Sequence, residues 1–389
     1  MRFSLTALTL CLLAPMAQAQ CGEAFPRFVG GLVSEAQKLG YPAQTATTFF
    51  KNVRIDPKVL AADRKQGVFQ MDFTSFARRL ISQGRIDKGI ANSRKYDAIF
   101  RRAEAQYGVP RGVLLAFWAF ETDYGSFQGD FNTLNALVTL AHDCRRPELF
   151  RPQIFSALEL YTKGDFDPNT TTGAWAGEIG MVQMLPRDIL ENGVDGDGDG
   201  HVNLKGSAPD ALMSGAKMLN HLGWRAGEPW LQEIIVPTNL DWSSTGTNTT
   251  KTVGEWAKLG VKPRGGSLGA SSLKASVILP QGRNGPAFLA YPNFDVYFEW
   301  NQSFTYVLTA AYFANRLGGA PAFDPRKPEI GLSGADMKAL QSKLAKRGHD
   351  VGKIDGILGS GTRNAVQFEQ KRLGLPADAW PTLALLSKL

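Results

Sequence analysis

A continuous apolar segment at residues 113–120 restricts the fold of this chain more than any other feature. Pro110 precedes it at a position typical of a first helical turn, and Gly125 follows it as a candidate C-terminal cap. The pattern therefore predicts an apolar helix that ends near Gly125.

The carboxylate of Glu121 continues the apolar stripe of this predicted helix. Leu114, Phe117, Trp118 and Glu121 follow helical i, i+3, i+4 and i+7 spacing. A carboxyl on such a stripe loses water, which raises its pKa and keeps it protonated near neutral pH. A general acid that cleaves a glycosidic bond needs this property. The simpler interpretation is that Glu121 is the first solvated residue at the helix end.

The N-terminus predicts export. Residues 1–19 combine a basic start, an apolar stretch and the small-residue site Ala17-Gln18-Ala19, as in a secretory signal peptide cleaved after Ala19. This segment is too short to remain as a membrane span, and we expect no transmembrane segment elsewhere. A periplasmic or secreted protein is the expectation.

Two cysteines, Cys21 and Cys144, remain after the signal peptide. In an oxidising compartment an even pair indicates a disulfide that ties the N-terminal arm to the main domain. The alternative is an outer-membrane lipoprotein with Cys21 as its modified first residue. The preceding Gln18-Ala19-Gln20 lacks the residues of a lipobox, which favours the disulfide.

The composition suits a globular protein with one large core and a small extra one: 389 residues, 43% hydrophobic and 20% charged. The formal net charge of +7 is scattered along the chain. It suits weak attraction to an anionic cell wall, and no nucleic-acid-binding motif is visible.

Helical periodicity dominates residues 22–318, with amphipathic stretches at residues 28–39, 96–107, 153–160, 210–222 and 303–317. Residues 241–273 predict a long loop or small subdomain around a helical fragment at 254–259, and residues 288–300 predict a short strand. Prolines at 321, 325 and 328 indicate a linker at 319–330. We therefore expect a mainly α chain of the α+β class, with domains at residues 20–318 and 331–389.

A glycine-rich segment, residues 173–186, is a candidate ligand-binding element. Its glycines allow close approach of the backbone, Trp175 offers a flat face to a sugar ring, and Gln183 offers both a donor and an acceptor. Glycines and a tryptophan also simply shape turns and fill cores.

An acidic loop predicts a calcium site. Asp195, Asp197 and Asp199 occupy positions one, three and five of an EF-hand-like pattern, and His201 offers its backbone carbonyl at position seven. Position twelve is a glycine, so Asp210, four residues later, is the candidate for the closing carboxylate. The ion's role would be structural. The alternative is a plain acidic turn.

Together these elements resemble the membrane-bound lytic murein transglycosylase B family over residues 25–318. The matching residues are Glu121, Thr122 and Gly125; Ala176, Gly177, Gly180, Gln183 and Pro186; the acidic loop; and Trp300, Asn301, Ser303 and Tyr306. The chain departs from the family pattern at Ala174, Met184 and Trp300, which concerns substrate contacts but not the acid. The resemblance implies a lysozyme-like, mostly helical catalytic domain.

The resemblance also implies a reaction on peptidoglycan glycan strands. Glu121 would be the lone catalytic acid of a water-free cleavage that leaves 1,6-anhydro-N-acetylmuramic acid ends. The residues expected to contact the sugars are Trp175, Gln183, Trp300, Asn301 and Tyr306.

Two alternatives remain. One is a hydrolytic muramidase assisted by Asp123 or Asp130, although two helical residues rotate Asp123 by about 200° from Glu121. The other is a non-catalytic, calcium-dependent wall-binding protein.

Residues 331–389 resemble a small three-helix peptidoglycan-binding domain. The matching positions include Leu340, Gln341, Leu344, Gly348, Asp355, Gly356, Ile357, Gly359, Thr362, Ala365, Val366 and Phe368. We expect this domain to bind the cell wall.

Overall fold

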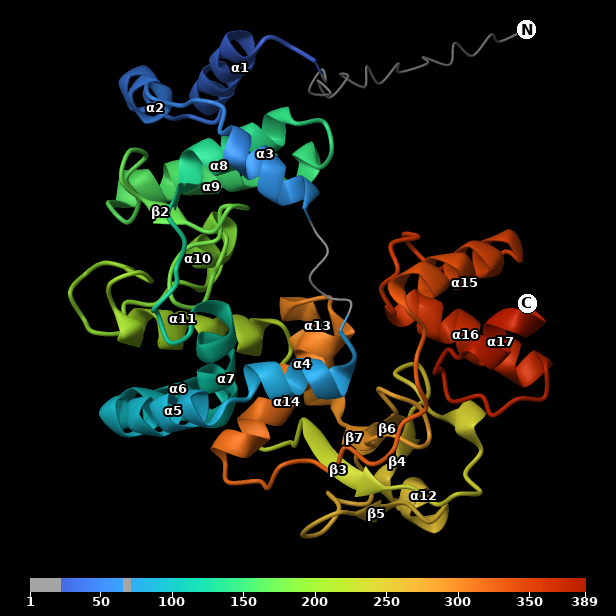
Figure 1. The fold of residues 1–389 in the computed structure, drawn as a ribbon. Helices are drawn as coiled ribbons and strands as arrows, with labels where there is room; N and C mark the ends of the chain where they lie inside the picture. Colours follow the sequence, from blue (N-terminus) through green and yellow to red (C-terminus); the bar gives the residue numbers. More distant parts are fainter. Residues whose placement is uncertain (1–21, 66–70) are drawn as a thin grey trace, which may run out of the picture.

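The computed structural model describes residues 22–65 and 71–389 (Figure 1). The predicted signal peptide and Cys21 lie outside these residues. Cys144 is disulfide-bonded.

Helices make up most of the described chain (Figure 1). In order they are α1 (Phe25–Lys38), α2 (Ala43–Phe50), α3 (Pro57–Arg64), α4 (Phe73–Leu80), α5 (Gln83–Lys95), α6 (Asp97–Tyr107), α7 (Arg111–Thr122), α8 (Thr133–His142), α9 (Pro147–Lys163), α10 (Pro186–Asn192), α11 (Ala208–His221), α12 (Val253–Lys258), α13 (Pro292–Trp300), α14 (Phe304–Leu317), α15 (Gly334–Lys346), α16 (Ser360–Arg372) and α17 (Leu383–Lys388). The five predicted amphipathic stretches correspond to α1, α6, α9, α11 and α14. The mainly helical fold is confirmed.

The strands are short: β1 (Phe131–Asn132), β2 (Thr172–Gly173), β3 (Leu231–Ile235), β4 (Lys251–Thr252), β5 (Lys262–Pro263), β6 (Lys274–Ile278) and β7 (Phe288–Ala290). β1 pairs with β2, and the other five form one antiparallel sheet in the order β4-β6-β7-β3-β5. This sheet has its own core around Trp256 of α12, which is fully buried and donates its indole N–H to the carbonyl of Ala275 at 2.8 Å.

One expectation for this region is confirmed and one needs correction. Residues 241–273 belong to a small subdomain around a helical fragment, which is one of the two predicted alternatives, and they contribute β4, β5 and α12. The strand expected at residues 288–300 is confined to β7, because Pro292 starts helix α13 two residues later. Phe294 and Tyr297, three residues apart, are both buried on that helix, and this spacing is helical rather than alternating.

Helix α7 lies at the centre of the main core. Residues 113–119 are all buried, and a Cβ on Gly112 would come within 2.9 Å of the Ala314 carbonyl oxygen. The absent side chain thus lets α7 approach the backbone of α14 closely. Pro110 is the N-cap of α7.

The predicted cap at Gly125 is wrong by two residues. Helix α7 ends at Thr122, and Asp123 caps it in the left-handed conformation with a φ of 49°. An aspartate tolerates this conformation better than most residues do. Gly125 instead turns the following loop, with a φ of 85°.

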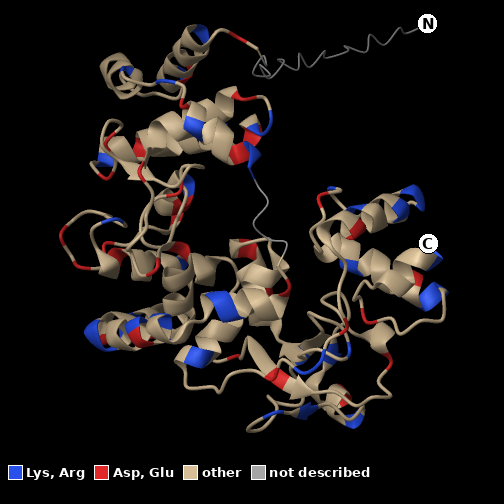
Figure 2. Ribbon diagram, viewed as in Figure 1, with Lys and Arg blue, Asp and Glu red and all other residues tan. Residues whose placement is uncertain are grey.

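The C-terminal helices α15, α16 and α17 surround a small separate core that includes Leu340, Leu344, Val366 and Leu385. Residues 320–333, which precede them, contain no helix or strand. Lys and Arg are spread over both parts of the molecule rather than gathered on one face (Figure 2). Among the described residues, no helix has the length and apolar character needed to cross a membrane.

Candidate active site

The end of α7 is tied to the glycine-rich segment through Thr122. The Thr122 hydroxyl donates a hydrogen bond to the Met181 carbonyl at 2.7 Å and accepts one from the Gly125 N–H at 2.9 Å. This buried threonine therefore joins the end of α7 to two other segments next to Glu121, and an apolar residue there would lose both hydrogen bonds.

Two aromatic donors hold the Glu121 carboxyl. The Tyr306 hydroxyl donates to Glu121 Oε1 at 2.5 Å, and the Trp300 indole N–H donates to the same oxygen at 3.1 Å. Both hydrogen bonds found in the described chain end on Oε1, which leaves Oε2 for a substrate. Tyr306 is buried, whereas Glu121 keeps part of its surface open to solvent.

Hydrogen bonds at the start of α14 fix the position of Tyr306. Asn301 Oδ1 accepts the Ser303 N–H at 2.9 Å, and the Ser303 side chain caps α14 by accepting the Tyr306 N–H at 3.4 Å. The expected sugar-contact residue Asn301 is therefore engaged in this turn. Trp300 packs its ring 4.4 Å from that of Phe117 while its N–H reaches Glu121.

The pKa of Glu121 is raised to about 7. Burial is the main cause, the hydrogen bonds from Tyr306 and Trp300 oppose it by favouring the charged form, and the nearby Glu178 adds a further upward effect. The carboxyl is thus half protonated near neutral pH, as the stripe of apolar residues in α7 predicts. Such a group can both donate and accept a proton.

The other two candidate carboxylates do not face Glu121. Asp123 forms ion pairs with Lys88 at 2.7 Å and Arg85 at 3.0 Å. The hydrogen bond from Lys88, with those from Arg85, lowers the pKa of Asp123 although partial burial opposes this. Asp130 is exposed.

The glycine-rich segment folds tightly beside this carboxyl. A Cβ on Gly173 would lie 1.9 Å from the Glu178 carbonyl oxygen, and one on Gly177 would lie 2.4 Å from Leu137. Gln183 has a φ of 52° and donates through Nε2 to the carbonyl of Gly180 at 2.8 Å. Trp175 packs partly buried against the main core.

Glu178 is a member of the site that the sequence analysis missed. Its burial raises its pKa, although backbone N–H groups of Glu178 and Ala176 donate to it. Its Oε2 is buried without a hydrogen-bond partner among the described residues. The available signal was a lone glutamate inside a glycine-rich segment that was already a candidate element.

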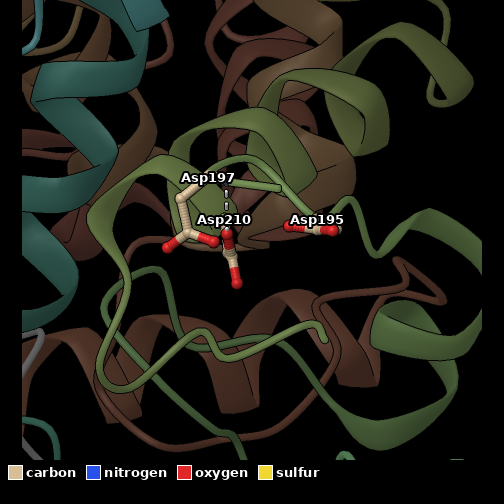
Figure 3. Close-up of side chains that lie close together, drawn as sticks. All are labelled: Asp195, Asp197 and Asp210. Atoms are coloured by element: carbon tan, nitrogen blue, oxygen red, sulfur yellow. Dashed lines mark hydrogen bonds between the residues drawn. The ribbon is translucent and has the colours of Figure 1, made fainter. Parts of the chain in front are cut away.

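Asp195, Asp197 and Asp210 form a second cluster, and a carboxylate oxygen from each lies within 4.8 Å of the others. Figure 3 shows the three side chains close together, from a loop and the start of α11. Asp210 is fully buried, and its Oδ1 accepts the Gly196 N–H at 2.8 Å. Asp210 thus joins the other two aspartates of the loop, although position twelve of the EF-hand-like pattern is a glycine.

The remaining two candidate metal ligands are placed differently. Asp199 accepts the His201 N–H at 2.9 Å and is not part of the three-carboxylate cluster. The His201 imidazole Nδ1 lies 3.0 Å from Asp165 Oδ1, and the ligand predicted at this loop position is the backbone carbonyl of His201.

Two segments of this chain match known protein families. Residues 24–315 match the transglycosylase SLT domain, and residues 333–389 match a peptidoglycan-binding domain. This chain is a member of the transglycosylase SLT family. The lysozyme-like assignment and the wall-binding tail are confirmed.

Named relatives agree with this membership. The chain is 27% identical to membrane-bound lytic murein transglycosylase B of Escherichia coli over 236 residues, which cover 60% of this chain and 64% of that relative. The match therefore spans less than two thirds of the length of that protein.

Solved structures extend the comparison to both domains. SltB3 from Pseudomonas aeruginosa, in complex with NAG-anhNAM-pentapeptide, superposes with a TM-score of 0.86 at 36% identity, covering 94% of this chain and 99% of that one. Escherichia coli Slt35 in complex with calcium superposes with a TM-score of 0.64 at 25% identity, covering 76% of this chain and 92% of that one.

Proposed function

We propose that this protein is a lytic murein transglycosylase. It cleaves the β-1,4 bond between N-acetylmuramic acid and N-acetylglucosamine of peptidoglycan without water, and it leaves 1,6-anhydro-N-acetylmuramic acid ends. Family membership and the likeness to SltB3, which was solved with an anhydro-muramyl peptide, support this activity.

One observation carries the proposal: among residues 22–65 and 71–389, Glu121 is the one carboxyl placed to act. Two donors hold its Oε1, its Oε2 is available, and its pKa is about 7. Asp123 is held in ion pairs, and Glu178 accepts the backbone N–H groups of its own turn. A hydrolase with two carboxylates would need a second ionised group across the scissile bond.

The proton path follows from this geometry. Protonated Glu121 gives its proton to the glycosidic oxygen as the bond from that oxygen to C1 of the muramyl residue breaks. The substrate's own N-acetyl group stabilises C1. Ionised Glu121 then takes the proton of the C6 hydroxyl as that oxygen bonds to C1, which restores the acid. Tyr306 and Trp300 stabilise the ionised intermediate state through their hydrogen bonds to Oε1.

Further roles in sugar binding are proposed for Gln183, Trp175 and Asn301, which lie on the segments that surround this carboxyl. Substitution of Gln183 by Ala tests the first of these. This substitution should raise KM for short glycan strands, whereas the melting temperature should change little. An unchanged KM would remove Gln183 from the binding site.

We also propose a structural calcium ion in the acidic loop. The donor set is all oxygen, as Ca²⁺ prefers, and consists of Asp195, Asp197, Asp210 and the His201 carbonyl. The loop spacing adds Asp199. Three carboxylates at this separation repel one another unless a cation or protons offset their charge. The relative Slt35 was solved with calcium.

We place the protein in the periplasm or outside the cell. The predicted signal peptide at residues 1–19 and a cell-wall substrate support this location. A disulfide between Cys21 and Cys144 would fit the same oxidising compartment, and the alternative of a lipid on Cys21 is tested by the mass of the mature N-terminal peptide.

A further inference from the structure

The C-terminal domain carries a charged groove on the face that does not contact the rest of the molecule. The groove has a volume of about 870 Å³ and lies where the ends of α15 and α16 meet. Its polar and charged lining consists of Arg347, His349, Asp350, Asn364, Glu369 and Arg372, and Phe368 is its exposed aromatic residue. Asp350 Oδ1 accepts the Gly352 N–H at 2.9 Å.

Helix α16 separates this groove from the domain interface. On one side Arg363 donates to the Pro280 carbonyl at 2.9 Å, and Gln367 donates to the carbonyls of Trp242 and Thr245 at 3.1 and 2.9 Å. Asn364, Phe368 and Arg372 follow at i, i+4 and i+8 and therefore share another side of the helix. The docked domain thus leaves the groove open.

A buried carboxylate organises the cations of the groove. Glu369 is 2% exposed and accepts hydrogen bonds from His349 Nε2 at 2.9 Å and from Arg372 Nε at 2.8 Å, while Arg347 Nη1 lies 3.8 Å away. Burial alone would raise the pKa of Glu369, but the hydrogen bonds from His349 and Arg372 and both guanidinium charges lower it. Glu369 therefore stays ionised and fixes its partners.

The two guanidinium groups retain unused donors that face solvent. Each arginine has five N–H donors. Arg372 uses two toward Glu369, and Arg347 also donates through Nη2 to the Leu389 carbonyl oxygen at 2.8 Å, so donors remain on both. The Arg347 and Arg372 side chains are 35% and 45% exposed. Two fixed, exposed guanidinium groups are suited to binding a carboxylate.

Phe368 adds an exposed apolar surface to these charges. Its side chain is 60% exposed, and its ring lies edge-on to that of His349, with 5.1 Å between the centroids. An exposed aromatic residue beside oriented cations is typical of a recognition surface.

We infer that this groove binds the peptide stems of peptidoglycan through their carboxylates, with Arg347 and Arg372 as the anion contacts and Phe368 as the apolar contact. This inference rests on the proposed function, because it assumes peptidoglycan as the ligand. Charge selects the peptide over the glycan. The N-acetylated sugars carry no free carboxylate along the strand, whereas the stems do.

The test measures binding of the full chain to purified sacculi in a Glu121→Gln background, so that the wall is not digested. Phe368→Ala and Arg372→Gln are compared with Ile354→Ala and Lys353→Gln, which remove an exposed apolar side chain and a positive charge outside the groove. Binding is measured on intact sacculi, alone and in competition with soluble stem peptides that an amidase has released from other sacculi.

We expect each groove variant to bind intact sacculi at least about fivefold more weakly, as when an anchoring aromatic or arginine is truncated at an interface. The two control variants should bind like the parent. Soluble stem peptides should weaken the binding of the parent and of the two controls, and should change the binding of the groove variants less. Equal binding of groove variants and controls to intact sacculi would overturn the inference. So would a failure of the stem peptides to weaken binding of the parent, because the groove would then not recognise the peptide.

A separate readout keeps this inference distinct from the catalytic proposal. Phe368→Ala in the active chain should cleave short soluble glycan strands at the parental rate, with an unchanged melting temperature. If the parental chain itself cleaves nothing, the catalytic proposal fails while the binding comparison still decides the groove.

Discussion

The Tyr306 hydroxyl donates to Glu121 Oε1 at 2.5 Å, and this contact joins the start of α14 to the end of α7. It favours the ionised form of the carboxyl and so opposes the effect of burial on the pKa of Glu121. The same contact stabilises the carboxylate that forms after the proton has been transferred. Tyr306 is therefore expected to set the pH range of activity.

Tyr306→Phe should raise the pKa of Glu121 above its value of about 7, because one of the two donors to the carboxylate is lost. The first step needs the protonated acid, so the fall in rate at high pH should move to higher pH. The maximal rate should fall by about tenfold to a hundredfold, as when one stabilising donor is removed. The measurement is a pH–rate profile with soluble glycan strands.

Tyr297→Phe is the matched control for that experiment. Tyr297 is buried, and its hydroxyl has no hydrogen-bond partner among the described residues. Its profile should follow that of the parent. Identical profiles for the Tyr306 and Tyr297 variants would contradict the proposed role of Tyr306.

Glu178→Gln should shift the same profile in the opposite direction. The charge of Glu178 contributes to the raised pKa of Glu121, so its removal should lower that pKa and move the fall in rate to lower pH. Glutamine retains an acceptor for the N–H groups of Ala176 and of residue 178, which preserves the turn. A shift to higher pH would be incompatible with charge repulsion between the two acids.

Glu121→Gln should stabilise the protein at alkaline pH. The pKa of Glu121 is raised from 4.5 to about 7 in the folded state, so the folded state holds this proton more tightly than the unfolded state does. The contribution of this proton to the free energy of unfolding is fully present below pH 4.5 and is lost as pH rises through 7. Gln retains the acceptor for Tyr306 and Trp300 and does not titrate.

The melting temperature of the Gln variant relative to the parent should therefore rise between pH 4.5 and pH 7 and stay level above it. Scanning calorimetry at several pH values makes the comparison. A difference that does not vary with pH would mean that the pKa of Glu121 is not raised by folding.

Calcium should raise the melting temperature, and a chelator should lower it. An ion at one hundred times its dissociation constant adds about 2.7 kcal/mol to the free energy of unfolding. Asp197→Asn should reduce this difference between calcium and chelator, whereas Asp241→Asn, in a distant exposed turn, should retain it. An undiminished difference in the Asp197 variant would remove that residue from the site.

Local signals in the sequence were sufficient to predict the helices and the surroundings of Glu121. The apolar stripe of α7 predicts both the burial of Glu121 and its raised pKa, and the loop spacing predicts that Asp210 joins Asp195 and Asp197. Each of these predictions uses residues that lie close together in the sequence, within one helix or one loop and its following helix.

Features that depend on long-range contacts were not predictable in this way. The pairing of β4 and β5 with the distant strands β6 and β3 decides that residues 241–273 form a subdomain. The Trp300 and Tyr306 donors lie some 180 residues from Glu121 along the chain, and only the packing of α14 on α7 brings Tyr306 to the carboxyl. Glu178 lies in a segment that was already a candidate, but its nearness to Glu121 depends on a long-range contact of the same kind.

The mass of the products released from purified sacculi tests the central claim most directly. A water-free reaction at Glu121 predicts that the parental chain releases muropeptides that end in 1,6-anhydro-N-acetylmuramic acid, each lighter by one water than the hydrolytic product, and that a folded Glu121→Gln variant releases none. Products that contain the added water, or undiminished anhydro products from the Gln variant, would contradict the account.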